Sequence, residues 1–500
     1  MRIHRLVLFL LVLVCLVAPD AGAQNEPIKG LDAYITKALK DWDAPGLALA
    51  IVKDDKVIYA KGYGVREMGK PDPVNEHTLF AIASTTKAMT AACVGMLVDE
   101  GKLKWDDPVT KHLPGFQLFD PYVTRELTVR DLLTHRSGLS RGDMIWYASE
   151  YDRKEVLRRI RFVEPTWSFR SRYGYQNIMY VAAGGVIESA SGKTWDDFIA
   201  ERLFTPLGMK RSNTSTSKLA GLDNVATPHG YDEGVLTTMK WRNFDNVGPA
   251  GSVNSSAYEM AQWVRLNLNK GEYEGKRILS EKVVEEMQSP QTIIRLDSLT
   301  QALTPSTHFL LYGFGWTLMD YQGRKVVRHD GALDGMRTRV AMLPEEKIGI
   351  VLITNQNRTQ ILTAMMFRIF DAFLNVKERD WSAEWLKSVK DQEQRSKEAE
   401  QKKIAERVKD TKPSLAMEKF AGNYENEIYG TMKVTVENGG LVISLNPSYT
   451  GDLVHWQYDT YQVQWRDKNL GKSYAVFSMN SNGKITALEW EGMDKFSRKD

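Results

Sequence analysis

Hydrophobic residues near both ends of the first 380 positions are spaced as in β-strands. Residues 47–52 and 56–64 form two apolar-rich runs separated by Asp54-Asp55, a pattern that predicts a β-hairpin. Residues 337–342 and 348–354 predict a second hairpin by the same pattern. Most of the chain between these regions has helical spacing. Strands on both sides of a helical middle predict an α+β fold, in which the terminal strands meet in an antiparallel sheet flanked by helices.

Several helices of this region are predicted from their first residues. Thr128 is followed three positions later by Asp131, and Ser256 is followed by Glu259; both pairs are typical of a capping box at a helix start. An alanine-rich apolar run follows Ser84 without a proline. Gly101 ends that run and is expected to cap the helix at its C-terminus.

The last fifth of the chain has a different pattern. Apolar and polar residues alternate through residues 432–436, 441–445 and 461–465, and Asn-Gly pairs mark the turns between such runs. This spacing predicts a small antiparallel β-barrel. The preceding stretch is dominated by charges of both signs, which is typical of a solvated helix or spacer.

Length and composition agree with a protein of several domains. A chain of 500 residues predicts two or three domains, and 43% hydrophobic residues are ordinary for a globular protein. The formal net charge of +3 gives no argument for a nucleic-acid or anionic-membrane partner. We expect a signal peptide at residues 1–23, a large α+β domain at 24–378, a charged helical linker at 379–413 and the barrel domain at 414–500.

The N-terminus resembles a secretory signal. Arg2 and Arg5 precede an apolar core, and Ala21-Gly22-Ala23 provides small residues for cleavage after Ala23. An N-terminal membrane anchor is the alternative, although the apolar run is short for a membrane span. We therefore expect a secreted or periplasmic protein with no stable membrane span after cleavage. Cleavage would leave Cys93 without a disulfide partner, and its apolar surroundings predict a buried packing role.

Ser84 and Lys87 are the first candidates for chemistry. Three residues apart at a helix start, their side chains share one helical face. The helix N-terminus adds free amides and the positive end of the dipole, and a neighbouring amine eases the loss of the serine proton. This suits a nucleophile in acyl transfer. Taken alone, the pattern also fits an N-capping serine followed by a surface lysine.

Two further segments supply matching groups. Tyr175 and Asn177 precede an apolar helix; a tyrosine beside a lysine ammonium is expected to have a lowered pKa, and it can accept the serine proton and later deliver it. His329 and Gly331 precede a strand, where glycine lets a substrate approach an edge and a nearby amide can complete an oxyanion hole. Each segment alone also fits a packed tyrosine or a loop histidine.

Taken in this order, the three segments resemble the motifs of the penicillin-recognising serine hydrolases. Residues 28–375 also resemble class C β-lactamase-like proteins in four segments: Leu132-Leu133-Thr134-His135-Arg136-Ser137-Gly138-Leu139, Pro206-Leu207-Gly208-Met209, Gly248-Pro249-Ala250-Gly251-Ser252 and Tyr312-Gly313-Phe314-Gly315-Trp316. The resemblance implies a β-lactamase/transpeptidase-like fold and an acyl-enzyme on Ser84.

The resemblance also implies a role for each matching residue. Lys87 would lower the proton affinity of Ser84 and Tyr175, and Tyr175 would be the general base and then the acid. Asn177 would orient Lys87 and the substrate. The remaining implied residues line the site: His329 opposite Tyr175, Gly331 beside it, and the amide of Ala332, which with that of Ser84 would form the oxyanion hole. His135 falls in a structural segment of the family and receives no catalytic role.

His329 departs from the pattern of true β-lactamases and carboxypeptidases, which usually have a lysine there. Histidine is only partly charged near neutral pH, so the case for β-lactams or C-terminal carboxylates is weaker. We expect a peptidase or esterase, including one that acts on D-amino-acid-containing peptides. The alternatives are a β-lactamase or D-Ala-D-Ala carboxypeptidase and, in another class, an inactive protein that binds peptidoglycan or a partner.

The C-terminal segment from Gly422-Asn423-Tyr424 to Asp459-Thr460 resembles the lipocalin-like barrel appended to some of these hydrolases. Such barrels contribute to assembly or restrict access in several relatives, so an oligomer is possible. A barrel filled with side chains is favoured over one that holds a ligand. No paired histidines at ligand spacing and no phosphate-binding glycine loop are found, so no metal or organic cofactor is expected; a small molecule or peptide is the expected substrate.

Overall fold

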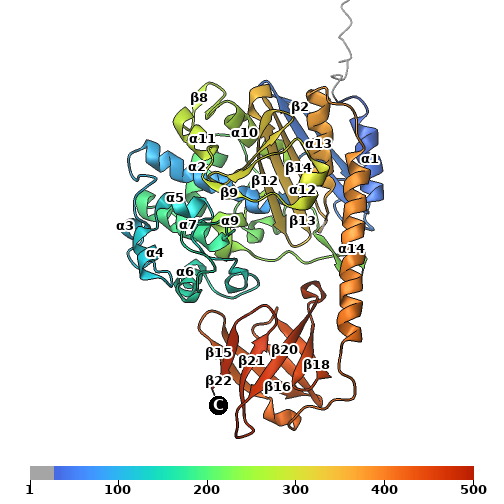
Figure 1. The fold of residues 1–500 in the computed structure, drawn as a ribbon. Coiled ribbons are helices and arrows are strands. Elements are labelled where there is room, and N and C mark those ends of the chain that lie inside the picture. Colours follow the sequence, from blue (N-terminus) through green and yellow to red (C-terminus); the bar gives the residue numbers. More distant parts are fainter. Residues whose placement is uncertain (1–27, 233, 358, 500) are drawn as a thin grey trace, which may run out of the picture.

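The structure, a computed structural model, describes residues 28–232, 234–357 and 359–499. The segment for which a signal peptide is predicted lies outside the described residues. Figure 1 shows a large domain of helices around a sheet, a long helix descending along one side, and a small barrel below. Within the described residues, no helix is both long and apolar enough to cross a membrane.

An eight-stranded antiparallel sheet forms the centre of the large domain. Its spatial order is β2-β1-β14-β13-β12-β11-β10-β9. The strands are Gly46–Lys53 (β1), Lys56–Gly64 (β2), Thr292–Ile294 (β9), Leu310–Tyr312 (β10), Thr317–Tyr321 (β11), Arg324–Leu333 (β12), Met336–Leu343 (β13) and Ile348–Thr354 (β14). Because β1 pairs with both β2 and β14, the predicted meeting of the terminal strands is confirmed.

Helices cover both faces of this sheet (Figure 1). One face packs against Leu31–Asp41 (α1) and Ile361–Phe373 (α13), and the other against Thr86–Asp99 (α2), Asn177–Ser191 (α7) and Ala257–Leu268 (α10). The remaining helices of this domain are Val109–His112 (α3), Pro121–Glu126 (α4), Val129–Leu133 (α5), Arg153–Arg159 (α6), Trp195–Ile199 (α8), Gly248–Gly251 (α9), Glu281–Met287 (α11) and Ser298–Leu303 (α12).

The sequence of β1 explains why it lies in the middle of the domain. Leu47, Leu49 and Ile51 point to the α1 and α13 side, whereas Ala48 and Ala50 point to the α2 side. A strand that is apolar on both faces is stable only when both faces are covered. The smaller alanines let helix α10 approach closely on one side.

Helix α2 is buried along nearly its whole length. Residues from Thr86 to Leu97 are buried, including Cys93, which is confirmed as a buried free thiol. Gly101 has φ 69°, and the amides of Glu100 and Gly101 donate to carbonyls in the last turn, so the predicted glycine cap is confirmed. Burial of α2 fixes the position of the residues at its N-terminus.

The two predicted capping boxes differ in outcome. At α5, Thr128 and Asp131 make both reciprocal bonds, as predicted. At α10, Ser256 caps the helix, but the Glu259 carboxylate instead accepts hydrogen bonds from the amide of Arg211 and the hydroxyl of Ser212. Hydrogen bonds with residues distant in the sequence therefore replace the reciprocal bond of the capping box.

Eight strands close the predicted C-terminal barrel. They are Gly422–Asn426 (β15), Gly430–Glu437 (β16), Gly440–Ser444 (β17), Thr450–Gln457 (β18), Thr460–Trp465 (β19), Lys472–Met479 (β20), Ile485–Trp490 (β21) and Lys495–Arg498 (β22). β15 pairs with β22 to complete the closure. The interior contains a cluster of apolar side chains, with Trp465, Trp490 and Tyr449 in mutual ring contact.

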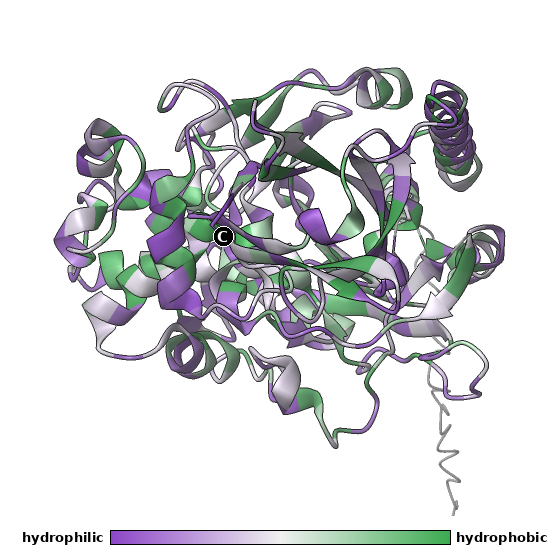
Figure 2. Cartoon of the chain, turned by 90° about the horizontal axis from the view of Figure 1, so that it is seen from below, coloured by the Kyte–Doolittle hydropathy of each residue, from purple (hydrophilic) through white to green (hydrophobic). Residues whose placement is uncertain are grey.

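Helix α14, Trp381–Ala405, joins the two domains. Its exposed residues are mainly hydrophilic, as predicted, and Figure 2 shows the helix almost end-on with mostly polar colouring. Its first turns differ from a solvated spacer, because Trp381 and Trp385 are buried against the large domain and the Trp381 indole donates to Asp371 at 2.6 Å. The helix is therefore anchored at its start and exposed along most of its length.

Candidate active site

Ser84 lies on a short turn that leads into α2. The strand Phe80–Ala81 (β3) precedes it, and Ala83 adopts φ 50°, a left-handed backbone that costs alanine about 1–2 kcal/mol. Ala83–Thr85 then form a 3₁₀ turn (η2) before α2 begins. Ser84 is partly exposed, whereas its neighbours on both sides are buried. The turn thus presents a single hydroxyl at the positive end of a buried helix.

Lys87 places its amine beside this hydroxyl. The distance from Lys87 Nζ to Ser84 Oγ is 3.0 Å, and Nζ also donates to Asn177 Oδ1 at 2.7 Å and to the carbonyl of Ala250 at 2.8 Å. The side chain is fully buried, and this burial lowers the pKa of Lys87 well below its usual range, although the charge of Asp143 opposes the shift. Burial therefore favours the neutral amine.

The neutral amine fits its partners atom by atom. It has two N–H groups and one lone pair. The N–H groups donate to two oxygens, Oδ1 of Asn177 and the carbonyl of Ala250. The lone pair is then left for the hydroxyl proton of Ser84, whose oxygen is the third neighbour. This arrangement can remove a proton from Ser84 without a further base.

Tyr175 completes the contact group around Ser84. Lys87 Nζ lies 4.8 Å from the centre of the Tyr175 ring. Burial raises the pKa of Tyr175, while interaction with the Ser84 hydroxyl lowers it; the net direction is upward. The expected lowering by a lysine ammonium is therefore wrong for the free protein, because burial disfavours the charged forms of both groups.

His135 holds the backbone on both sides of Tyr175. Its Nδ1 accepts from the amide of Gln176 at 3.1 Å, and its carbonyl accepts from the amide of Gly174 at 2.8 Å. The imidazole also lies 4.2 Å from the Tyr175 ring, centre to centre. Burial lowers the pKa of His135, so the ring is neutral and can accept at Nδ1. The residue is consistent with the structural assignment and positions the phenol.

Asn177 is held by a residue that the sequence did not indicate. Its Oδ1 accepts from Lys87, and its Nδ2 donates to Asp143 Oδ1 at 2.8 Å. Asp143 is also paired with Arg141, whose guanidinium lies 5.1 Å from the Tyr175 ring centre. Both residues belong to a segment without a motif, so only their proximity in space reveals them. They fix the orientation of the Asn177 amide.

His329 lies in β12 on the other side of the site. Its ring centre is 6.5 Å from that of Tyr175. Nε2 is 2.9 Å from the hydroxyl of Tyr312, and Nδ1 is 2.8 Å from the carbonyl of Asp330. Burial lowers the pKa of His329 to about 3, so the imidazole is neutral at physiological pH. The sequence indicates Tyr312 only as part of a strand segment, and no local pattern predicts its contact with His329.

Gly331 allows β12 to approach the nucleophile turn. A Cβ at this position would lie 2.2 Å from the carbonyl oxygen of Ile82, so no larger residue fits without movement. The requirement comes from this contact between backbone segments, whereas the sequence suggested room for a substrate. This close packing places β12 against the turn that carries Ser84. The exposed Ala332 follows Gly331 on the same strand.

The strand edge beside the site is open. β11 pairs with β12 only from Arg324 to Arg328, so the segment from His329 to Leu333 is paired with β13 alone. Backbone groups on its other edge are available to a substrate or to an oxyanion. The geometry therefore brings Ser84, Lys87, Tyr175 and Asn177 into direct contact, with His329, Gly331 and Ala332 forming the opposite wall.

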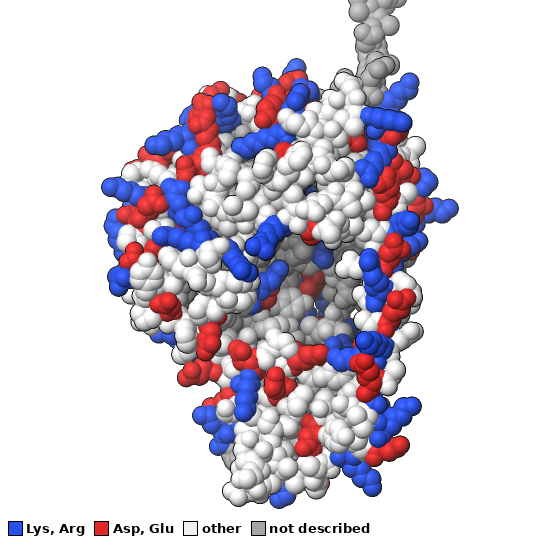
Figure 3. Space-filling view, in the orientation of Figure 1, with Lys and Arg blue, Asp and Glu red and all other residues white. Residues whose placement is uncertain are grey.

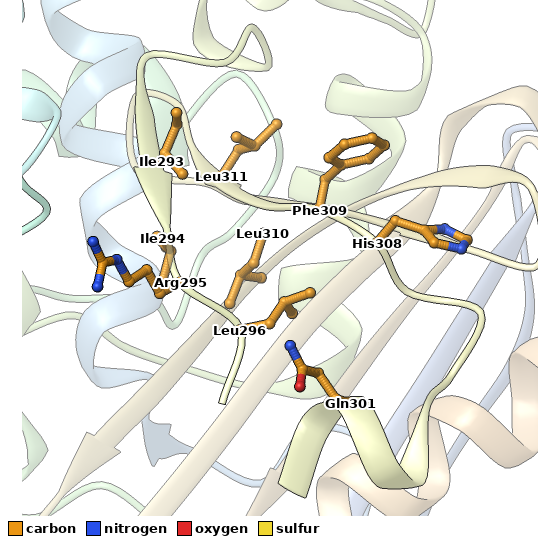
Figure 4. A pocket seen from close by; sticks show the side chains of 9 residues that line it. All are labelled: Ile293, Ile294, Arg295, Leu296, Gln301, His308, Phe309, Leu310 and Leu311. Atoms are coloured by element: carbon orange, nitrogen blue, oxygen red, sulfur yellow. The ribbon is translucent and has the colours of Figure 1, made fainter. Parts of the chain in front are cut away.

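A separate surface pocket lies at the edge of the sheet. Figure 4 shows its side chains, which come from β9, β10 and the segments beside them, with a cavity of about 460 Å³. Its lining includes Ile293 and Phe309, which are 75% and 63% exposed, but none of the predicted catalytic residues. No group of three or more His, Cys, Asp or Glu residues that could hold a metal ion occurs within the described part of the chain.

Comparison with known proteins places this geometry in context. Residues 31–371 match the family model described as Beta-lactamase, and residues 406–500 match a domain of unknown function, DUF3471. An unguisins hydrolase of Aspergillus campestris is 29% identical over 423 residues, covering 80% of this chain and 76% of the relative. Penicillin-binding protein 4 of Amycolatopsis lactamdurans is 30% identical over 321 residues, covering 62% and 81%.

A solved structure shows the same fold in both domains. The octameric penicillin-binding protein homologue from Pyrococcus abyssi superposes with a TM-score of 0.63 at 23% identity, covering 94% of this chain and all of that one. The matched length includes the large domain and the barrel. The expected β-lactamase/transpeptidase-like fold with a C-terminal barrel is therefore confirmed.

Proposed function

Because this chain belongs to the beta-lactamase family and is a serine hydrolase, we propose that it cleaves an amide or ester bond through an acyl-enzyme on Ser84. The observation that carries the proposal is the 3.0 Å contact between Lys87 Nζ and Ser84 Oγ, made by a buried amine whose other partners are two oxygens. An amine in this setting can take the serine proton as the nucleophile attacks.

In the proposed acylation, each group around Ser84 has one role. Ser84 Oγ attacks the carbonyl carbon while its proton passes to the amine of Lys87. The amides of Ser84 and Ala332 donate to the oxyanion, and the tetrahedral intermediate collapses when Tyr175 gives its proton to the leaving group. The proton on Lys87 then passes to the Tyr175 phenolate and restores the neutral phenol. In deacylation, water attacks the carbonyl carbon of the acyl-enzyme, and the same groups transfer protons in the reverse order to regenerate Ser84.

The proposed substrates are peptides or esters without an obligatory carboxylate beside His329. A neutral imidazole bonded to Tyr312 and to the Asp330 carbonyl offers no fixed positive charge to an anion. The name of the fungal relative as an unguisins hydrolase supports hydrolysis as the reaction class. Peptides that contain D-amino acids are included among the proposed amide substrates.

A second candidate is a β-lactamase or D-Ala-D-Ala carboxypeptidase. The 30% identity to a penicillin-binding protein favours it, because such a relative is named for binding penicillin. The two candidates differ in turnover of nitrocefin, which the leading proposal predicts to be slow compared with that of matched esters or D-peptides. We also propose that the protein is exported, on the basis of the basic, apolar and small-residue pattern of residues 1–23.

The proposal is tested with the protein comprising residues 24–500. A fluorophosphonate probe should label the wild type at Ser84, and hydrolysis of esters and D-peptides should be lost in Ser84→Ala with an unchanged thermal transition. Ser140→Ala is the matched control and should remain active, because Ser140 is a partly exposed serine whose carbonyl, and not its hydroxyl, accepts a hydrogen bond from Gln176. Equal labelling of Ser84→Ala and wild type would reject the nucleophile. A folded wild type that is silent to the probe, to labelled penicillin and to all substrates would favour a binding protein.

A further inference from the structure

Arg242 connects the barrel to the tip of the β12–β13 hairpin of the large domain. Asp334 lies at this tip, two residues after Ala332. Its carboxylate accepts from the hydroxyl of Tyr147 at 2.8 and 2.9 Å, and from Arg242 Nε at 2.8 Å. Only 14% of the Asp334 side chain is exposed, so these bonds are largely shielded from water.

Arg242 continues this connection into the barrel. Its Nη2 donates to Asp467 Oδ2 at 2.8 Å, and its Nη1 donates to Ser448 Oγ at 3.2 Å. The guanidinium is 16% exposed and lies 5.0 Å from the Tyr147 ring centre. One cation thus bridges a carboxylate of the hairpin and a carboxylate of the barrel. A planar guanidinium can satisfy both at once in a fixed geometry.

A second contact reaches the opposite wall of the site. The hydroxyl of barrel residue Tyr449 is 3.2 Å from the sulfur of Met144, and its ring contacts Tyr147. Met144 follows Asp143, the residue that orients Asn177. The barrel therefore touches the segments that carry both walls. Figure 3 shows the hollow between the large domain, the charged helix on one side and the barrel, which these contacts leave open.

The hairpin tip needs such anchors. Ala332 lies on the part of β12 that β11 does not pair, so β13 and the contacts of the tip hold its amide in place. On its other side, the tip is fixed by the amide of His229, which donates to the carbonyl of Gly335 at 3.2 Å. Without Arg242, the Asp334 carboxylate would keep its bonds with Tyr147 but would lose its hydrogen-bonded link to the barrel.

We propose that Asp467 of the barrel, acting through Arg242 and Asp334, is a positioning residue that holds the Ala332 amide in the oxyanion hole. The inference rests on the acyl-enzyme function proposed above. It makes the barrel part of the catalytic apparatus: the C-terminal domain supplies no reacting group, but it sets the position of one that stabilises the transition state.

The test compares two neutralising substitutions in the barrel. Asp467→Asn removes the charge facing Arg242, and Glu491→Gln removes the 2.9 Å ion pair between the barrel and Lys403 of α14, far along the chain from the hairpin. Loss of an oxyanion donor costs roughly 10²–10³ in kcat, and partial misplacement of one should cost about 10-fold. Asp467→Asn should therefore lower kcat and the rate of fluorophosphonate labelling about 10-fold with KM nearly unchanged.

Glu491→Gln should leave kcat, KM and the labelling rate at wild-type values. Equal rates for wild type and Asp467→Asn would overturn the proposal, as would an equal loss in both variants or a change confined to KM. A wild type that is not labelled at Ser84 would instead reject the proposed function itself, so the two failures are distinguishable.

A second variant keeps the proposal testable if Asp467→Asn unfolds. Arg242→Lys retains the charge but replaces the planar fork by a point donor that cannot hold both carboxylates. We expect a loss of kcat similar to that of Asp467→Asn, and a double variant no worse than either single one, because both remove the same connection. Independent, multiplicative losses in the double variant would contradict a shared route.

Discussion

The two domains differ in what their cores contain. Buried polar and charged side chains are frequent in the hydrolase domain and include Lys87, Asp131, His135 and His329. Among the described residues, the last such side chain along the sequence is Ser382, before the barrel begins. The barrel interior is a cluster of apolar and aromatic side chains. The domain that carries the reactive groups is the one that keeps polar atoms away from water.

This contrast follows from the cost of burying polar groups. An unpaired buried polar atom destabilises a fold by about 1–3 kcal/mol, so such groups are retained only where partners satisfy them or where chemistry requires them. Lys87 combines both conditions: three oxygen neighbours surround it, and its burial disfavours the charged form. The barrel has no such requirement, and its ion-paired side chains, such as Asp452 and Glu491, are exposed.

The largest effect that separates the domains is expected from Tyr175→Phe. The change removes the hydroxyl that interacts with Ser84 and keeps the ring against His135. We expect kcat to fall roughly 10²–10⁴-fold, the usual contribution of acid–base catalysis. Thermal unfolding should be nearly unchanged. Steady-state rates and calorimetry measure the two properties.

The matched control for this change is Tyr173→Phe. Tyr173 is a neighbouring, partly buried tyrosine whose ring lies 6.5 Å from that of Tyr175, and it takes no part in the proposed steps. Its loss should change kcat little. If both variants lost activity equally, the phenol of Tyr175 would have no special role.

The next effect concerns stability. Asp131 is fully buried and accepts bonds from Arg136 at 2.6 Å, from Arg170 at 2.6 Å and from Thr128. Burial alone would raise the pKa of Asp131, but these bonds lower it overall. Asp131→Asn leaves two cations with weaker partners, so we expect a loss of about 3 kcal/mol in the unfolding free energy of the hydrolase domain.

The barrel offers the corresponding surface pair. Asp452 and Arg466 are 3.1 Å apart, and each is about half exposed. Asp452→Asn should therefore have no measurable effect on urea unfolding. Similar losses in the two variants would mean that the domains do not differ in how their ion pairs contribute.

A further difference between the domains is expected in acid sensitivity. Burial lowers the pKa values of His135, His229 and His329, the last to about 3, whereas an unfolded histidine titrates near 6.5. Below about pH 6.5 the unfolded chain binds protons that the folded domain excludes. As the pH decreases, the unfolding free energy should fall by about 1.4 kcal/mol per pH unit for each such histidine that stays neutral in the folded protein.

Hydrogen exchange at pH 7.5 and pH 5 can resolve this effect by domain. Peptides of the hydrolase domain should lose protection first, and those of the barrel, whose one histidine, His455, is partly exposed, should change less. Parallel loss in both domains would remove the distinction.

The sequence determined the elements and most of the candidate site. Alternation and turn residues were sufficient for the terminal hairpins and for several of the barrel strands, because side-chain direction in a strand repeats every two residues. The spacing of Ser84 and Lys87 on one helix was sufficient to place their side chains together. Contacts of this kind are local, and so a short stretch of chain is enough to fix them.

Only the tertiary structure decided how distant groups act on one another. It brought Asp143 to Asn177, Tyr312 to His329 and Arg242 between Asp334 and Asp467. It also reversed the expected shift in the pKa of Tyr175 and drew Glu259 away from its helix cap. These outcomes depend on burial and on partners far along the chain, which no local pattern specifies, because the free energy of a charge or a hydrogen bond is set by everything that surrounds it.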